Sequence, residues 1–279
     1  MRIPPFITQV SAKGTLLLAC AFAVGTLIFV IGFVLAGGIR HVTWEFLTGP
    51  ILDMGRSGGI LPTIVGTALM VLVAIGIAAP LGIASAVYLA EYTREGRITR
   101  SIRFGINCLS GVPSIIFGLF GFILFVMIMG FGWSILSGGL SLTAMVLPTI
   151  ILTSEEALRS VPIQYRTVAA SLGATRWQVV TKSVLPYATP GILTGIILSI
   201  GRSIGETAAV IFTAGAAVQM PGSLFDSART MAVHFYTLAR EGISNDMAYA
   251  TAAVLILSIL VINITAYAMM NRLTRGRRG

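Results

Sequence analysis

The stretch VPIQYRTVAASLGATRWQVVTKSVLP, from Val161 to Pro186, decides how the rest of this chain is interpreted. It lies between hydrophobic segments, carries no acidic residue, and holds three basic residues, Arg166, Arg176 and Lys182. The pattern predicts two short helices that meet near Gly173, because glycine permits the sharp turn that ends one helix. Pro186 is expected to end the second helix. A basic pair of helices between membrane spans is a poor membrane segment and a good docking surface.

The composition is that of an integral membrane protein. Of the 279 residues, 56% are hydrophobic and 10% are charged, whereas soluble domains contain about 25% charged residues. The mean hydropathy is +0.91, and one transmembrane domain over residues 1–279 is the natural organisation. The net charge of +9 would suggest nucleic acid as a partner of a soluble protein. Here the basic residues flank hydrophobic segments, so we expect contact with anionic membrane lipid and no nucleic-acid partner.

The chain contains few residues of the kinds that bind metals or form disulfides. Cys20 and Cys108 lie in or beside apolar runs and indicate no disulfide framework. His41 and His234 are far apart in the sequence, lack a partner at metal-binding spacing, and are both expected in solvated loops. The sequence therefore predicts neither a metal site nor another cofactor.

The hydrophobic runs predict six transmembrane helices, each of which needs about 20 apolar residues. The uncharged run from Phe104 to Ser154 is too long for one crossing and must fold back, with its turn at Gly130–Gly139. Glu91–Arg103 is expected to be a charged loop, and Ala217–Asp246 a polar loop with room for a partial re-entrant helix. The predicted spans are Gly14–Ile39, Pro62–Ala90, Cys108–Met129, Leu140–Ser154, Thr189–Ala216 and Met247–Met270.

The first span is too long for a cleavable signal peptide, and we expect it to be retained. Lys and Arg number 2, 4, 4 and 4 in the N-terminus, the loops after spans two and four, and the C-terminal tail. The three loops on the opposite side hold 2, 0 and 2. The positive-inside rule then predicts that both termini and the Val161–Pro186 stretch face the cytoplasm.

This stretch resembles the cytoplasmic coupling loop of ABC importer permeases, whose pattern is EAA, three residues, Gly, nine residues, Ile-x-Leu-Pro. Gly173 and the Leu185–Pro186 pair have that spacing, and Ala169 occupies the second Ala. Three positions depart from the pattern: Thr167 replaces Glu, Val168 replaces the first Ala, and Ser183 replaces Ile. An ordinary amphipathic interfacial helix is the alternative, but it does not account for the Gly-to-Pro spacing.

The resemblance implies that a coupling loop at about 155–187 seats two short helices in a groove of a partner ATPase. The residues implied in ATPase coupling are Ala169, Ala170, Leu172, Gly173, Ala174, Arg176, Trp177, Leu185 and Pro186. The resemblance further implies an all-α integral membrane fold with six transmembrane helices, the type I, MetI-like permease fold.

Five further fragments, in order along the chain, resemble phosphate importer permeases of the PstA type. They are GGILPTIVGT (58–67), PLGIASAVYLAEY (80–92), GVPSIIFGLFG (111–121), LGATRWQ (172–178) and GRSIGETAAV (201–210). The resemblance implies a subunit of a cell inner membrane importer, paired with a PstC-like second permease. It also implies a PstB-like ATPase dimer that supplies energy and a PstS-like binding protein that delivers inorganic phosphate.

Arg202 and Glu206 lie in the middle of the predicted fifth span, where a charge costs about 2.5–3.5 kcal/mol on insertion scales. Their spacing of four predicts one shared helix face. We interpret Arg202 as lining an anion pathway, because guanidinium stays charged and can bind phosphate oxygens in a bidentate manner. Glu206 would neutralise Arg202 in an empty pathway and accept a hydrogen bond from protonated phosphate. The alternative is an internal ion pair that holds span five to a neighbour.

Two other patterns carry expectations about packing and exposure. Gly191-x-x-x-Gly195 and Gly201-x-x-x-Gly205 are predicted to permit close helix approach on span five. Glu155 and Glu156 are expected on a solvated face before the coupling loop, with pairing to Arg159 or to partner arginines as the alternative.

The sequence contains no G-x-x-x-x-G-K-[ST], H-E-x-x-H, CxxC or G-x-S-x-G motif, so we expect a transport subunit and not an enzyme. Three alternatives remain beside phosphate import. The same fold could import molybdate or sulfate, or the chain could be an ATP-independent secondary transporter. An intramembrane enzyme is disfavoured because no nucleophile–base or metal constellation is present.

Overall fold

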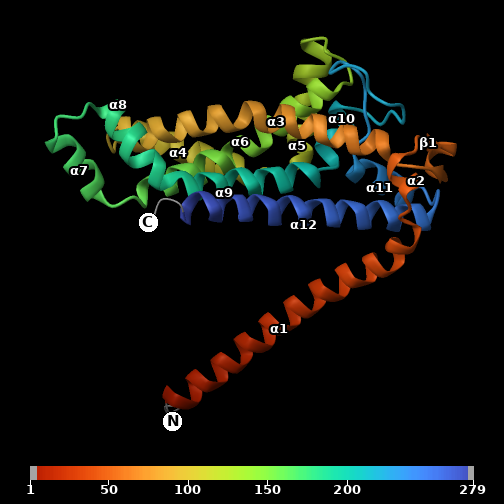
Figure 1. The fold of residues 1–279 in the computed structure, drawn as a ribbon, viewed down its shortest axis with the longest axis horizontal. Coiled ribbons are helices and arrows are strands. Elements are labelled where there is room, and N and C mark those ends of the chain that lie inside the picture. The colour runs from red at the N-terminus through yellow and green to blue at the C-terminus, as the bar shows by residue number, and fades with distance from the viewer. Residues whose placement is uncertain (1–4, 276–279) are drawn as a thin grey trace.

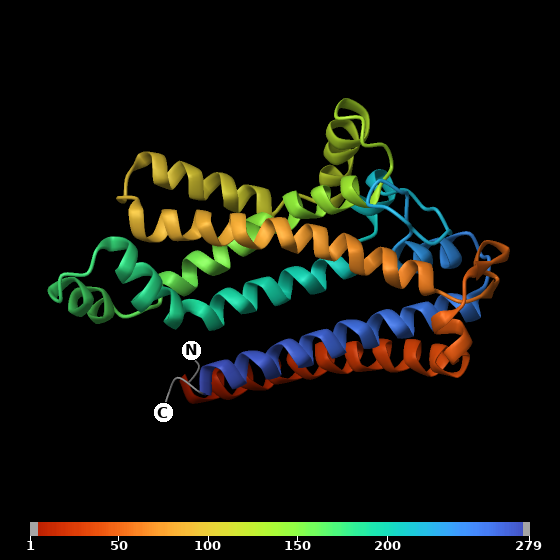
Figure 2. The ribbon, with the colours of Figure 1, turned by 45° about the horizontal axis from the view of Figure 1, so that its top comes forward.

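The computed structural model describes residues 5–275, with side chains described for 13–270 and for Arg272. The chain forms an elongated helical bundle with one small hairpin (Figures 1 and 2). The elements are α1 (Pro5–Gly38), η1 (Ile39–His41), α2 (Trp44–Thr48), β1 (Ile51–Leu52), η2 (Asp53–Gly55), β2 (Ser57–Gly58), α3 (Leu61–Val87), η3 (Tyr88–Tyr92), α4 (Arg97–Ser110), α5 (Ser114–Gly121), η4 (Phe122–Ile128), α6 (Ile135–Arg159), α7 (Ile163–Ser171), α8 (Arg176–Gln178), η5 (Val179–Val184), α9 (Leu185–Ile204), α10 (Ala208–Thr213), α11 (Met231–Arg240) and α12 (Asn245–Arg275). Of the η elements, η3, η4 and η5 are π-helical, and β1 pairs antiparallel with β2.

Five helical segments are long and apolar enough to cross a membrane, namely Lys13–His41, Leu61–Tyr92, Ile135–Arg159, Arg176–Ile204 and Asn245–Met270. A sixth crossing exists if Arg97–Ser110 and Ser114–Ile128 count as one span, although these helices are bent by 98°. The third span was predicted as one helix over Cys108–Met129, and this is wrong. Pro113 precedes α5 with an extended ψ of 140°, because proline cannot continue the hydrogen bonding of the preceding helix.

Several predicted boundaries are corrected. Glu91–Arg103 is no loop, since its first residues close η3 and its last ones open α4. The turn before span four is shorter than Gly130–Gly139, because the Ser134 hydroxyl accepts a hydrogen bond from the Ser137 N–H and starts α6 at Ile135. Span five does not run to Ala216, since α9 ends at Ile204 and a separate short helix follows. The polar loop after it contains α11, a helix of 10 residues.

The core is densest where α3 crosses α6. Met70, Ala74 and Ala78 of α3 are fully buried against Val146 and Ile150 of α6. Glycines permit this close approach: a Cβ on Gly82 would meet the Ile150 side chain at 2.6 Å, and one on Gly139 would meet Val73 at 2.5 Å. The α3–α6 pair thus forms the frame to which the remaining helices attach.

The glycines of α9 behave differently from one another. A Cβ on Gly191 would lie 2.6 Å from the Ala157 Cβ, and one on Gly195 would collide with Thr153, so the first glycine pair does permit α9 to approach α6. At Gly201 no neighbouring atom of this chain lies within 4 Å. The second glycine pair therefore leaves open space beside α9 and makes no close helix contact within the described chain.

Helix α1 diverges from the bundle (Figure 1). Its contact with α12 is tight near its end, where a Cβ on Gly38 would collide with the Tyr249 carbonyl oxygen and lie 2.8 Å from the Ala253 Cβ. Most of its apolar side chains are exposed, as at Phe22 and Leu18. An apolar helix of this length is suited to a bilayer or a neighbouring subunit.

Different elements lie at the two ends of the long axis of the bundle. The start of α1 and the end of α12 lie at the same end as α7 and α8, whereas the β1–β2 hairpin and α11 lie at the other (Figures 1 and 2). The predicted basic tail falls partly outside the described residues, at Arg277 and Arg278, as does Arg2 at the N-terminus.

Candidate functional site

The coupling loop has the predicted helix–Gly–helix geometry, and its local sequence explains why. Gly173 has φ +79°, and the N–H groups of Gly173 and Ala174 donate to the carbonyls of Ala170 and Ala169, which ends α7 in a Schellman motif. Thr175 then caps α8: its hydroxyl accepts from the Gln178 N–H, and the Gln178 side chain accepts from the Thr175 N–H. The fragment LGATRWQ therefore encodes a helix stop followed at once by a helix start.

The predicted coupling residues divide into an exposed face and a packed root. The exposed face includes Leu172 at 83% exposure and Trp177 at 66%, with Ala170, Gly173 and Arg176 also exposed. Ala169, Ala174 and Leu185 are half-buried and pack against a core cluster that contains Leu158 and Val184. An exposed Leu and Trp beside a basic residue form a surface that needs a partner.

Pro186 does not end the second coupling helix, which corrects the sequence-based prediction. The helical segment from Arg176 continues without a break through η5 and α9 to Ile204. Pro186 occupies the first turn of α9, where its missing N–H is tolerated because the preceding π-helical turn changes the hydrogen-bond register. The second coupling helix and span five are therefore one rod.

Arg202 and Glu206 do not share a helix face, because α9 ends between them. Arg202 lies in the last turn of α9 and is exposed, while Glu206 follows the end and is half-buried. The Glu206 carboxylate accepts a hydrogen bond from the Ala209 N–H at 3.2 Å and so caps the start of α10. Within residues 5–275 no ion pair joins Arg202 to Glu206. The neutralising contact expected between the two residues is therefore absent from the described structure. Neither residue forms an ion pair with a neighbouring helix there, so the alternative is absent as well.

A charge cluster connects three elements at the α7–α8 end of the bundle. Glu155 of α6 accepts from Arg103 Nε of α4 at 2.6 Å and from Arg159 Nε at 3.0 Å. Glu95, in the linker before α4, accepts from Arg103 Nη1 at 2.8 Å and from Arg159 Nη2 at 2.7 Å. These hydrogen bonds hold the pKa of the Glu95 carboxyl below its usual range, with Arg159 the larger cause. Two arginines and two glutamates therefore compensate one another.

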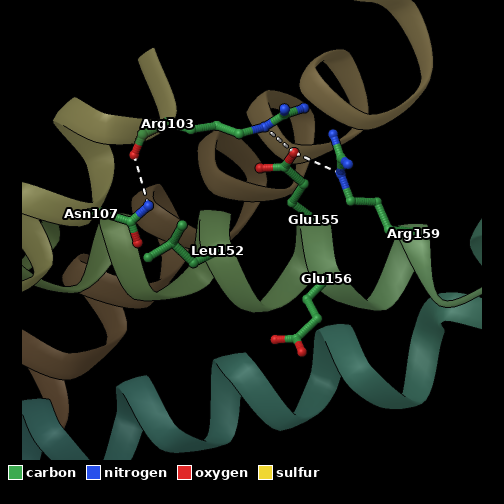
Figure 3. A pocket seen from close by; sticks show the side chains of 6 residues that line it. All are labelled: Arg103, Asn107, Leu152, Glu155, Glu156 and Arg159. Atoms are coloured by element: carbon green, nitrogen blue, oxygen red, sulfur yellow. Dashed lines mark hydrogen bonds and ion pairs between the residues drawn. The ribbon is translucent and has the colours of Figure 1, made fainter. Parts of the chain in front are cut away.

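Glu155 pairs with Arg159, as the alternative to a solvated face expected. Its side chain is buried at 5% exposure instead of lying on a solvated face, whereas Glu156 is exposed as expected. Figure 3 shows the two carboxylates pointing in opposite directions, with Arg103 and Arg159 converging on Glu155 alone. An open hollow of about 490 Å³ lies between α4 and α6 at this place.

The ion pair between Arg166 and Glu91 was also not predicted from the sequence. Arg166 of α7 donates from Nη2 to Glu91 of η3 at 2.6 Å, and from Nη1 and Nη2 to the carbonyls of Val161 and Leu158 at 2.7 and 2.8 Å. Glu91 and Arg166 lie 75 residues apart in the chain, so no local spacing could have indicated the contact.

His234 was predicted in a solvated loop, but it lies on α11 and is only 1% exposed. Its Nδ1 lies 3.3 Å from Arg229 Nη1, and Arg229 Nε donates to the Ala216 carbonyl at 3.0 Å. Burial, and next the charge of Arg229, lowers the pKa of His234 to about 4. The imidazole is therefore neutral at physiological pH and accepts from the guanidinium, which ties α11 to the segment after α10.

This burial predicts a pH-dependent stability. Between the ordinary pKa of 6.5 and about 4 the unfolded chain binds a proton at His234 that the folded chain does not, so stability is lost as pH falls through this window. From pH 7.5 to pH 5 the loss should be about 2 kcal/mol, or roughly 4–8 °C in Tm. His234→Asn keeps an acceptor for Arg229 and should remove this part of the pH response in detergent melts. Equal pH responses of wild type and His234→Asn would contradict the prediction.

A model of the family described as binding-protein-dependent transport system inner membrane component matches residues 78–279. The chain belongs to this family. Permeases of this family work with an ATPase and a binding protein, and they are multi-pass proteins of the inner membrane. The matched region includes the coupling loop, the charge cluster around Glu155 and the break after α9.

Several relatives cover most of the permease. The probable ABC transporter permease protein YqgI of Bacillus subtilis is 33% identical over 276 residues, which are 93% of this chain and 94% of the relative. A phosphate transport system permease protein PstA of Pasteurella multocida is 34% identical over 89% of both chains. The PstA of Xylella fastidiosa is 36% identical over 78% of this chain and 76% of its own.

Solved transporters confirm the MetI-like ABC permease fold. A bacterial alginate ABC transporter in complex with a periplasmic protein superposes with a TM-score of 0.68 at 15% identity, covering 96% of this chain and 95% of that one. The MetNI methionine ABC transporter, in an inward-facing conformation, gives 0.64 at 20% identity, covering 76% and 95%. At these identities the likeness concerns the fold of the permease alone.

Proposed function

We propose that this chain, as a single permease domain over residues 1–279, is the transmembrane subunit of an ATP-driven importer of inorganic phosphate. The cargo is inferred from sequence similarity: over most of its length the chain is 33–36% identical to permeases named for phosphate transport. Arg202 supplies a matching chemistry, because an exposed guanidinium at the end of α9 can bind phosphate oxygens.

The two ends of the bundle then have different partners. The exposed face of α7 and α8, with Leu172, Arg176 and Trp177, docks on one copy of a PstB-like ATPase dimer. This end, with both termini, lies in the cytoplasm, as the distribution of basic residues predicts. A PstS-like binding protein delivers phosphate at the opposite end, and a PstC-like second permease completes the pathway. ATP hydrolysis belongs to the partner.

Uptake of labelled phosphate tests the proposal. Phosphate-starved cells that carry this chain as their sole permease of this type should accumulate phosphate, and cells without it should not. A hundredfold excess of unlabelled phosphate should abolish uptake, whereas the same excess of sulfate or molybdate should not. Competition by sulfate or molybdate would reassign the cargo to another oxyanion, and full uptake by a complex that purifies without an ATPase would indicate a secondary transporter.

A further inference from the structure

Arg166 is placed in the coupling helix α7 but turns away from its exposed face. Its side chain is 20% exposed, whereas Val168 and Leu172 on the outer face are 61% and 83% exposed. The sequence-based view of Arg166 as part of a basic docking surface therefore does not describe its position. Its guanidinium points into the bundle.

The contacts of Arg166 join three elements. Glu91, which is 10% exposed, lies at the end of the rod formed by α3 and η3, and its carboxylate accepts from both Nε and Nη2. The carbonyls of Leu158 and Val161 lie at the C-terminal end of α6 and just beyond it. A cation at a helix C-terminus is also favoured by the helix dipole.

Few other contacts hold α7 in this position. Every residue of α7 is at least partly exposed, so the apolar burial that fixes most helices is small here. The Tyr165 ring packs against the Tyr187 ring at the start of α9, with ring centroids 4.0 Å apart and the ring planes tilted by 42°. The Arg166 contacts are therefore the polar attachment of α7 to α3 and α6.

We propose that Arg166 is a positioning residue that transmits movement of the coupling helix to the core helices α3 and α6. The inference rests on the proposed function, because it assumes that an ATPase displaces α7. A displacement of α7 with the ion pair intact moves η3, at the end of the α3 rod, and the end of α6; α3 and α6 are the two helices that form the densest core. Without the ion pair α7 can follow the ATPase while the core helices stay in place.

The test compares transport with ATP hydrolysis in proteoliposomes that contain the complete importer. Arg166→Gln should leave the ATPase bound and hydrolysing ATP, but lower the phosphate transported per ATP by about tenfold, which is within the usual range of coupling between sites. Glu91→Gln should have a smaller effect, because the two carbonyl contacts remain. Arg166→Lys should recover part of the ratio, since lysine keeps the charge but not the planar fork.

Arg94→Gln is the control, because it removes an exposed positive charge three residues from Glu91 and outside the coupling loop, and its ratio should equal that of wild type. The proposal is overturned if Arg166→Gln keeps the wild-type ratio, or if it loses the ATPase from the complex, which would make Arg166 a docking or folding residue. If the wild-type complex transports no phosphate, the proposed function is contradicted instead. The coupling can then still be measured as the stimulation of ATP hydrolysis by the binding protein.

Discussion

Phosphate uptake is expected to fall by about 100-fold when Arg202 is replaced by glutamine, because two charge-assisted hydrogen bonds to the anion are lost. Glutamine keeps much of the length and polarity of arginine but carries no charge. The measurement is initial uptake of labelled phosphate in phosphate-starved cells with the variant as their only copy. Membrane levels and co-purification of the ATPase show whether the complex still assembles.

The surroundings of Arg202 explain why this arginine is singled out. It occupies the last turn of α9, where the negative end of the helix dipole lowers the cost of a cation. Helix α9 ends at Ile204, and irregular backbone at membrane depth is tolerated where it is buried in protein or lines a water-filled cavity. Within the described residues, no atom of another element lies within 4 Å of a Cβ on Gly201, the residue before Arg202. An exposed guanidinium beside open space is suited to a passing anion.

Arg240→Gln is the control for the loss of an exposed positive charge elsewhere. Arg240 ends α11 and stacks on the ring of Tyr236, with its guanidinium carbon 5.5 Å from the ring centroid, and its replacement should leave uptake within twofold of wild type. Arg202→Lys should retain part of the uptake, because it keeps the charge but not the bidentate geometry. Equal uptake by wild type and Arg202→Gln would make Arg202 structural and would remove it from the pathway.

The sequence predicted those features that depend on neighbouring residues. The stop of α7 at Gly173 and the start of α8 at Thr175 follow from residues within one turn of each other. The spans could be located because a bilayer demands a minimum length of apolar chain. Both kinds of signal are local. The stop of α7 and the start of α8 are confirmed, whereas the third predicted span is bent by 98° and the fifth ends at Ile204.

The features that were missed depend on residues distant in the chain or on small changes in backbone geometry. The partners of Glu155 include Arg103, which lies 52 residues earlier, so periodicity could not distinguish it from Glu156. The break between Arg202 and Glu206 falls within a run that remains apolar on both sides, and hydropathy cannot detect it. The sequence predicted that the helix ends at Pro186. The π-helical turn η5 shifts the hydrogen bonding before this proline, so the helix continues through it. Burial of His234 likewise follows from tertiary packing alone.

Glu155→Gln is expected to destabilise the folded permease by about 3 kcal/mol, because it removes the buried carboxylate and leaves two guanidinium groups to share the exposed carboxylate of Glu95. Arg103 has a side chain that is 19% exposed, and it would keep Glu95 as its remaining carboxylate. Glutamine retains the shape of glutamate, so loss of packing does not contribute. Thermal or chemical unfolding of the purified complex in detergent measures the change.

Glu156→Gln is the matched control, since it changes the adjacent carboxylate, which is exposed and points away from both arginines (Figure 3). Its effect should stay within about 0.5 kcal/mol, as for most surface substitutions. The double variant Glu155→Gln/Arg103→Gln should lose less than the sum of the two single variants, because the uncompensated charge has been removed as well. If Glu155→Gln and Glu156→Gln proved equally stable, the charge cluster would contribute nothing to the attachment of α4 to α6. Apolar packing near the bend between α4 and α5 would then have to hold α4 in place.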